Sequence, residues 1–188
     1  MSDQPSLPTE DDLKKLPLLA IVAYAVRCAR RALPIVDTVP SFATHGAAVK
    51  QAISFVERFC VGEDLNVAPD AAERAADAAG RAAAVAQSFA GGSVLALAAG
   101  AAQAAAQAAA AVEDSWADPN SADRVVRVAT YAASRASRAV PAVSAAAKAD
   151  YDRLLSWNQG TYSDLGQPID PTETGPLGPL WPEASPEG

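Results

Sequence analysis

Two features of this sequence predict an all-α protein. Nearly every second residue between Ala71 and Ala149 is alanine, which is the strongest intrinsic helix former. Ahead of this stretch, apolar residues recur at intervals of three and four between Val49 and Cys60, the spacing of one helix face. We therefore expect an alanine-rich antiparallel bundle of five to six helices with an extended Pro/Gly-rich C-terminal tail.

Prolines, glycines and capping residues set the expected boundaries. Residues 1–12 are polar and acidic, so we expect a disordered lead. Pro34 is expected to end the first helix, because proline breaks the backbone hydrogen-bond ladder. The helical domain then spans residues 13–160, with helices expected over about 13–33, 46–61, 69–89, 94–116, 122–140 and 142–157.

A ~50-residue repeat is a second interpretation of the same helices. The pattern Pro-x-x-Ala begins at Pro17, Pro69 and Pro119, which are spaced 52 and 50 residues apart. Three stacked helical hairpins would produce this spacing. Alanine-rich sequence aligns with itself easily, however, so a plain bundle is the preferred prediction.

The tail, residues 161–188, is dominated by proline and glycine, which excludes helix. Apolar residues still occur in it, and they can act as anchors in an extended segment. In one interpretation the tail lies back on its own bundle or is disordered. In the other it is a docking peptide that enters a groove on a partner through Leu177, Leu180 and Trp181.

The longest uncharged segment runs from Ala82 to Val112, thirty-one residues. Its second half, residues 93–112, has the length of a membrane span. Alanine inserts poorly compared with leucine or phenylalanine, and no flanking Lys or Arg is present. We expect a buried central helix, with a membrane-active or pore-forming hairpin as the alternative.

Charge and cysteine content bound the partners and the compartment. The net charge of −7 argues against a nucleic-acid binder. Cys28 and Cys60 lie in apolar helical patterns without CxxC spacing, so we expect buried free thiols and a cytoplasmic protein. The runs AIVAYAVRCARR and GPLGPLWPE are similar to segments of bacterial alanine-rich proteins, a resemblance that implies a bacterial, intracellular origin and no particular activity.

Residue types that carry catalysis are scarce. His45 is the single histidine, expected in a loop, and no GxSxG, GxGxxG or GxxxxGK[ST] motif is present. Asp70, Glu73 and Asp77 share one helix face but have no histidine companion, so we expect a solvated face rather than a metal site. We predict no enzyme activity, no cofactor and no metal.

One surface stands out as a candidate binding site. Residues at intervals of three and four place one stripe on the fifth expected helix, namely Arg124, Arg127, Tyr131, Arg135 and Arg138. The opposite stripe is apolar and is expected to be buried: Val125, Val128, Ala129, Ala132 and Ala136. Arginines around an aromatic ring can bind phosphate or stack on bases, so this stripe could face an acidic partner or a nucleic acid. The alternative is a solvated face that pairs with Glu113, Asp150 or Asp152.

A second arginine group, Arg27, Arg30 and Arg31, falls near the expected end of the first helix. Cations there complement the negative end of the helix dipole, which is a structural role. The sequence thus predicts a non-catalytic protein-binding, scaffold or adaptor module with an unidentified protein partner. Homo-oligomerisation is left open, while nucleic-acid and membrane partners are not expected.

Overall fold

A computed structural model describes residues 6–63, 70–89, 92–115, 118, 120–157 and 160–181. Every regular element within these ranges is helical, which confirms the predicted all-α class. Seven α-helices and one short 3₁₀ helix follow in order: α1 (Glu10–Leu13), α2 (Leu18–Asp37), η1 (Pro40–Phe42), α3 (Ala43–Cys60), α4 (Ala71–Ala86), α5 (Gly92–Ser115), α6 (Ser121–Ala139) and α7 (Val143–Trp157).

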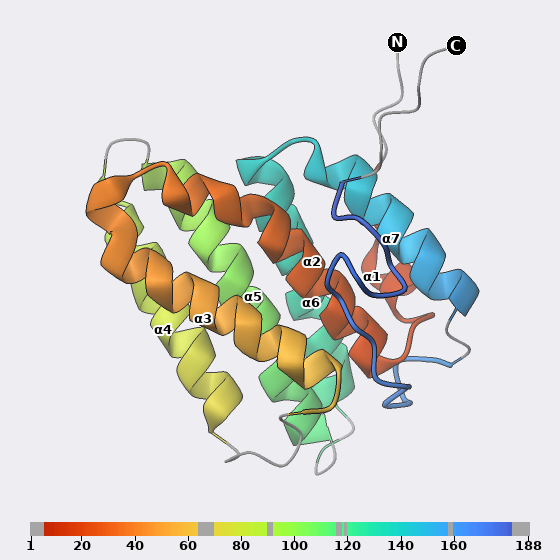
Figure 1. The fold of residues 1–188 in the computed structure, drawn as a ribbon. Helices are drawn as coiled ribbons and strands as arrows, with labels where there is room; N and C mark the ends of the chain where they lie inside the picture. Colours follow the sequence, from red (N-terminus) through yellow and green to blue (C-terminus); the bar gives the residue numbers. More distant parts are fainter. Residues whose placement is uncertain are drawn as a thin grey trace, which may run out of the picture.

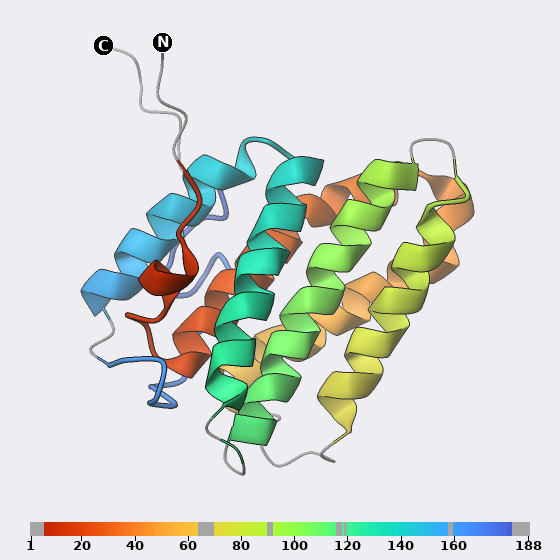
Figure 2. The ribbon, with the colours of Figure 1, turned by 180° about the vertical axis from the view of Figure 1, so that it is seen from behind.

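The helices form two layers. Seen from behind, α4, α5, α6 and α7 lie side by side in one layer (Figure 2), and each packs on its neighbour. Helices α2 and α3 cross the other side of that layer (Figure 1), with α2 packed on α5, α6 and α7 and α3 packed on α4 and α5. The hydrophobic core lies between the two layers.

Helix α5 is the central element, as the uncharged sequence predicted. It contacts α2, α3, α4 and α6, and 16 of its 24 residues are buried, mostly alanines. A helix that is apolar all round belongs in an interior. It is also the one described helix long and apolar enough to cross a membrane by length and composition, and 78% of its most apolar window is buried inside the protein.

Helix α2 starts and ends later than the predicted range 13–33. We expected Pro34 to end it, yet the helix continues to Asp37 with Pro34 inside its last turn. The extra turn buries Val36 against α3, where a Cβ added to Gly46 would lie 2.8 Å from Val36 Cγ1. This apolar contact keeps the last turn helical although proline removes one backbone donor.

Part of the lead that was expected to be disordered is structured, since a short helix begins at Glu10; residues 1–5 of that lead lie outside the described residues. Thr9 caps α1 in a capping box with Asp12: the Thr9 side chain accepts from the Asp12 N–H and the Asp12 side chain accepts from the Thr9 N–H. This arrangement satisfies two N–H groups that a helix start leaves free. Leu13 and Leu16 are fully buried behind it.

His45 lies in the first turn of α3 rather than in a loop, since the expected loop over 34–45 shrinks to a short connection around η1. Its ring packs on Phe42, with ring centroids 5.5 Å apart. Cys28 and Cys60 are free and buried, as predicted.

The hairpin repeat predicted from Pro17, Pro69 and Pro119 has a simple counterpart in chain order: α2 with α3, α4 with α5, and α6 with α7. The packing does not follow it, however. Helix α6 packs most extensively on α5 and only lightly on α7, and α2 contacts α5 and α6 more than it contacts α3. The arrangement is therefore a bundle around α5 rather than a row of stacked hairpins.

Residues 160–181, which we call the strap, contain no helix and run back over α2 and along α7 (Figure 1). The strap caps two helix ends. Its Asp164 and Leu165 carbonyls accept from the N–H groups of Leu18 and Leu19, both at 2.9 Å, at the start of α2. The Ile169 N–H donates to the Cys60 carbonyl at the end of α3 at 2.8 Å. Helix ends need such partners, because their terminal N–H and C=O groups have none within the helix.

Candidate functional site

The predicted arginine stripe lies on the outer side of α6, and we call it the α6 face: Arg124, Arg127, Tyr131, Arg135 and Arg138. The opposite side of the helix is buried, including Val125, Ala129, Ala132 and Ala136 as predicted. Val128 is the exception, since it is only partly buried and borders the α6 face.

The arginines of the α6 face have different surroundings. Arg124 forms an exposed ion pair with Asp114 at 3.3 Å. Arg127 and Arg138 are exposed, and neither forms an ion pair with a carboxylate in the described part of the chain. The predicted alternative partners do not pair with them: Asp152 pairs with Lys148 at 2.6 Å, Asp150 is buried elsewhere, and Glu113 forms no ion pair in the described part of the chain.

Tyr131 and Arg135 form a stacked pair. The Arg135 guanidinium lies 4.5 Å from the Tyr131 ring centroid and also donates to the Tyr131 hydroxyl. Arg135 reaches over α5, where Gly100 leaves room for it: a Cβ there would meet Arg135 Nη1 at 2.4 Å. Arg135 is thus held in place by α5, and it supports a Tyr131 ring that is 49% exposed.

A shallow groove of about 400 Å³ runs beside this ring, between α6 and the start of α1. Its lining combines apolar surface with hydroxyl groups and charged groups of both signs. The lining residues are Glu10, Arg127, Val128, Thr130, Tyr131 and Ser134. The groove therefore offers an aromatic ring, the Arg127 guanidinium, which forms no ion pair within the described residues, and the Glu10 carboxylate.

A buried ionic cluster, which sequence reasoning missed, lies between α2, α7 and the strap. Arg27 Nε donates to Asp150 Oδ2 at 2.8 Å, and Arg31 Nη1 lies 2.6 Å from the same oxygen. All three side chains are 1% exposed or less. One carboxylate thus balances two guanidinium groups in the interior, and a buried charge needs such partners to be tolerated.

Strap carbonyls supply the remaining hydrogen bonds of this cluster. Arg27 donates through both terminal nitrogens to four strap carbonyls at 2.9–3.3 Å, those of Pro171, Thr172, Gly178 and Pro179. Arg31 Nε donates to the Leu180 carbonyl at 2.5 Å, and Arg153 Nη1 donates to the Leu177 carbonyl at 2.5 Å.

This cluster corrects the interpretation of Arg27, Arg30 and Arg31 as helix-dipole partners. Because α2 continues to Asp37, none of the three is in its last turn. Arg30 instead pairs with Glu57 of α3 at 2.6 Å, and burial raises the pKa of Glu57 despite that pair. The sequence signal that could have revealed the cluster is the four-residue spacing of Arg27 and Arg31, which places both on one face of a mostly apolar helix.

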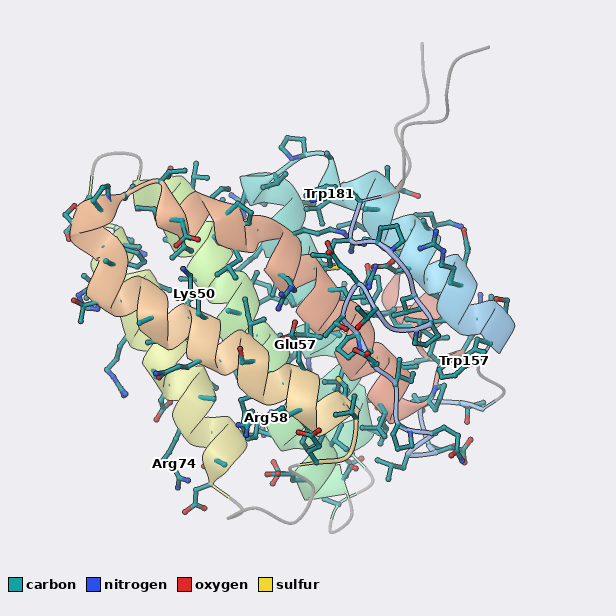
Figure 3. The ribbon with its side chains drawn as sticks, in the orientation of Figure 1. Lys50, Glu57, Arg58, Arg74, Trp157 and Trp181 are labelled. Carbon is teal, nitrogen blue, oxygen red and sulfur yellow. The ribbon has the colours of Figure 1, made fainter. Side chains whose placement is uncertain are left out.

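The predicted docking residues of the tail lie on their own molecule. Leu177 is 1% exposed and Leu180 is 9% exposed, both packed against the bundle. Trp181 is 39% exposed, with the Arg31 guanidinium 5.9 Å from its ring centroid. Figure 3 places Trp181 near the start of α7 and Trp157 at its far end. The interpretation in which the tail lies back on its own bundle therefore describes residues 160–181.

Metal-ligating side chains do not cluster in the described ranges. No three His, Cys, Asp or Glu side chains there are arranged to hold a metal ion. Asp70 of the acidic stretch forms a long, exposed ion pair with Arg74 at 3.8 Å. Burial raises the pKa of the Cys28 thiol to about 12, so it is neutral rather than a nucleophilic thiolate.

The fold and these sites define the chain as an all-α bundle with an arginine-bound strap and an exposed arginine–tyrosine face. Comparisons with protein-family models, with curated proteins and with solved structures found no match to this chain.

Proposed function

We propose that this protein is a non-catalytic binding module whose α6 face binds an acidic surface of a protein partner. The observation that carries the proposal is the exposure of Arg127 and Arg138 on either side of the Tyr131 ring, where neither forms an ion pair with a carboxylate of the described residues, although Glu10 lines the groove beside Arg127. Arginine and tyrosine are the residue types enriched in the binding hot spots of protein interfaces.

The rigidity of the α6 face supports the same proposal. Arg135 holds the Tyr131 ring from the side of α5, so little side-chain freedom is lost when a partner covers the ring. The net charge of −7 favours a protein partner over a nucleic acid, because general nucleic-acid binding requires a basic surface.

A cytoplasmic location is part of this proposal, since free thiols such as Cys28 and Cys60 are typical of reducing compartments. The membrane-active alternative gains no support from α5, most of which is buried inside the protein. A docking role for Leu177, Leu180 and Trp181 requires first that the strap leave its own bundle.

Charge reversal on the α6 face tests the proposal. The double variant Arg127→Glu, Arg138→Glu and a control, Arg81→Glu on the exposed side of α4, are used as bait in cell lysate at 50 and 300 mM salt. We expect the wild type and the control to retain the same partners at low salt and to lose them at high salt. The double variant should retain none of these partners at either salt concentration.

The free energy of unfolding of all three proteins should agree within about 0.5 kcal/mol, because the changed side chains are exposed. Identical partner profiles for the wild type and the double variant would show that the α6 face is a solvated surface without a binding role.

A further inference from the structure

The strap is recognised chiefly through its backbone. Arg27, Arg31 and Arg153 donate to six of its carbonyl groups, and two of these belong to Pro171 and Pro179. Proline has no N–H and fixes φ, so a proline-containing segment presents acceptors in a preset extended form. Guanidinium groups, which only donate, are the matching partners.

Side-chain recognition of residues 169–181 combines buried apolar anchors with one aromatic ring, since Trp181 lies against the Arg31 guanidinium. Ile169 and Leu177 are each 1% exposed, and Leu180 is 9% exposed. The hydrogen bonds of the strap carboxylates stay within the strap: Asp164 accepts from Thr161, and Asp170 accepts from Thr172 and Thr174. The groove therefore binds an extended backbone with apolar side chains at fixed spacing.

The arginines of this groove depend on the strap for acceptors. Arg27 and Arg31 both pair with the carboxylate of Asp150, and their other hydrogen bonds go to strap carbonyls. If the groove were empty, both guanidiniums would need new acceptors, because unsatisfied buried charges are costly. An occupant rich in carbonyl oxygens is thus required for the groove to remain closed to water.

The strap has a natural point of division. Gly166 has a φ of +82°, and the next two residues, Gln167 and Pro168, are exposed. Before this point the strap caps the start of α2, and after it residues 169–181 fill the arginine-lined groove. The second part, which we call the distal strap, can move without uncapping α2.

We infer that the arginine-lined groove between α2, α3 and α7 is an exchangeable peptide site, and that it accepts the distal strap of a second copy of this chain. Every contact that the groove makes in one chain is reproduced when the segment comes from a partner copy, which makes such swapping energetically inexpensive. The resulting dimer would exchange distal straps through the Gly166–Pro168 connection.

Energy transfer between two full-length preparations tests this inference. Ser54 of α3 and Thr172 of the distal strap line the same cleft. Glu173 is the residue that follows Thr172. One preparation carries a donor dye at Ser54→Cys, and the other carries an acceptor dye at Glu173→Cys. Since each chain holds one dye, transfer requires two copies to associate, and the matched variants below assign that association to the distal strap. We expect transfer to develop slowly after mixing.

Matched variants connect the transfer to the groove. Leu180→Ala removes a buried anchor and should accelerate exchange at least tenfold, whereas Leu155→Ala, an exposed leucine on α7, should leave the rate unchanged. Combining the labels with Arg127→Glu and Arg138→Glu should have no effect, so the result is independent of the proposed α6 function. Absence of transfer in both wild type and Leu180→Ala, or immediate transfer insensitive to Leu180→Ala, would overturn the inference.

Hydrogen exchange of the unmodified chain provides a second test that does not depend on a variant folding. The Ile169 amide bonds to the Cys60 carbonyl, and it should exchange at least tenfold faster than the Leu19 amide and the amides of α5. If Ile169 exchanges only together with α5, the distal strap opens only on global unfolding, and the inference fails.

Discussion

At the scale of single residues, one residue type forms the helices and another makes the specific contacts between them. Alanines fill α5, while the long-range polar contacts converge on a few arginines. The four-residue spacing of Arg27 and Arg31 was visible in the sequence, but their partner Asp150 is 123 residues from Arg27. Such a pairing depends on how α7 packs on α2, which a single sequence does not specify.

The first residue-scale prediction concerns the two thiols. Burial raises the pKa of Cys28 to about 12 and also raises the pKa of Cys60. We expect neither to react with a thiol reagent at pH 8 until the protein unfolds, because only the thiolate is nucleophilic. Labelling kinetics with and without guanidinium chloride measure this, with Ser54→Cys as an exposed thiol that reacts at once.

These raised pKa values also give a pH dependence. A thiol whose pKa is higher in the folded state stabilises the fold below its unfolded pKa of about 8.5, and this contribution declines as the pH rises towards 12. Rapid labelling of Cys28 in the native protein at pH 8 would contradict the burial on which both expectations rest.

The second residue-scale prediction concerns the α1 capping box. Hydrogen bonds from Lys15 and Thr9 lower the pKa of Asp12 from 3.8 to about 2. Because the folded pKa is lower, Asp12 stabilises the protein above about pH 4, and the stabilisation is lost as the pH falls towards 2. We expect Asp12→Asn to lower the Tm at pH 6 and to match the wild type near pH 2, measured by circular dichroism. An equal difference at both values would show that charge plays no part.

At the scale of elements, the sequence predicted the long helices well and their ends less well. Alanine content and periodicity located α3 to α7 to within a few residues, because propensity summed over a long segment is informative. The end of α2 was wrong, since packing of Val36 on Gly46 outweighs the effect of Pro34. Helix α1 was missed because four residues carry little periodic signal, although the Thr9-x-x-Asp12 spacing is a capping pattern.

Close packing of α5 gives a prediction at this scale. Ala105 and Ala109 are fully buried, so Ala105→Leu or Ala109→Leu should overpack the core. We expect each to lower the free energy of unfolding by about 1–3 kcal/mol. Urea titration measures this, with Ala84→Leu on the exposed side of α4 as a control that should stay within about 0.5 kcal/mol. Neutral substitutions on α5 would mean that the centre of the bundle is loosely packed.

At the scale of the whole molecule, the strap joins elements that the helices alone leave open. It caps the start of α2 and the end of α3 and covers the arginines that face α7. The tail composition predicted an extended segment, and Leu177 and Leu180 were recognisable as anchors. Their burial site could not be derived from sequence, because it depends on six backbone carbonyls that have no side-chain signature.

The buried ionic cluster gives the prediction that tests this role, since Asp150 joins α7 to α2 and, through Arg27 and Arg31, to the strap. Asp150→Asn removes the carboxylate that pairs with Arg27 and Arg31 and leaves two buried guanidinium groups without an ion-pair partner. Breaking a buried pair in this way costs about 3–5 kcal/mol. The control, Asp152→Asn, removes an exposed carboxylate two residues away that pairs with Lys148, and it should cost less than about 1 kcal/mol. Denaturant titration compares the two; equal losses would mean that water reaches the cluster and that the strap does not seal it.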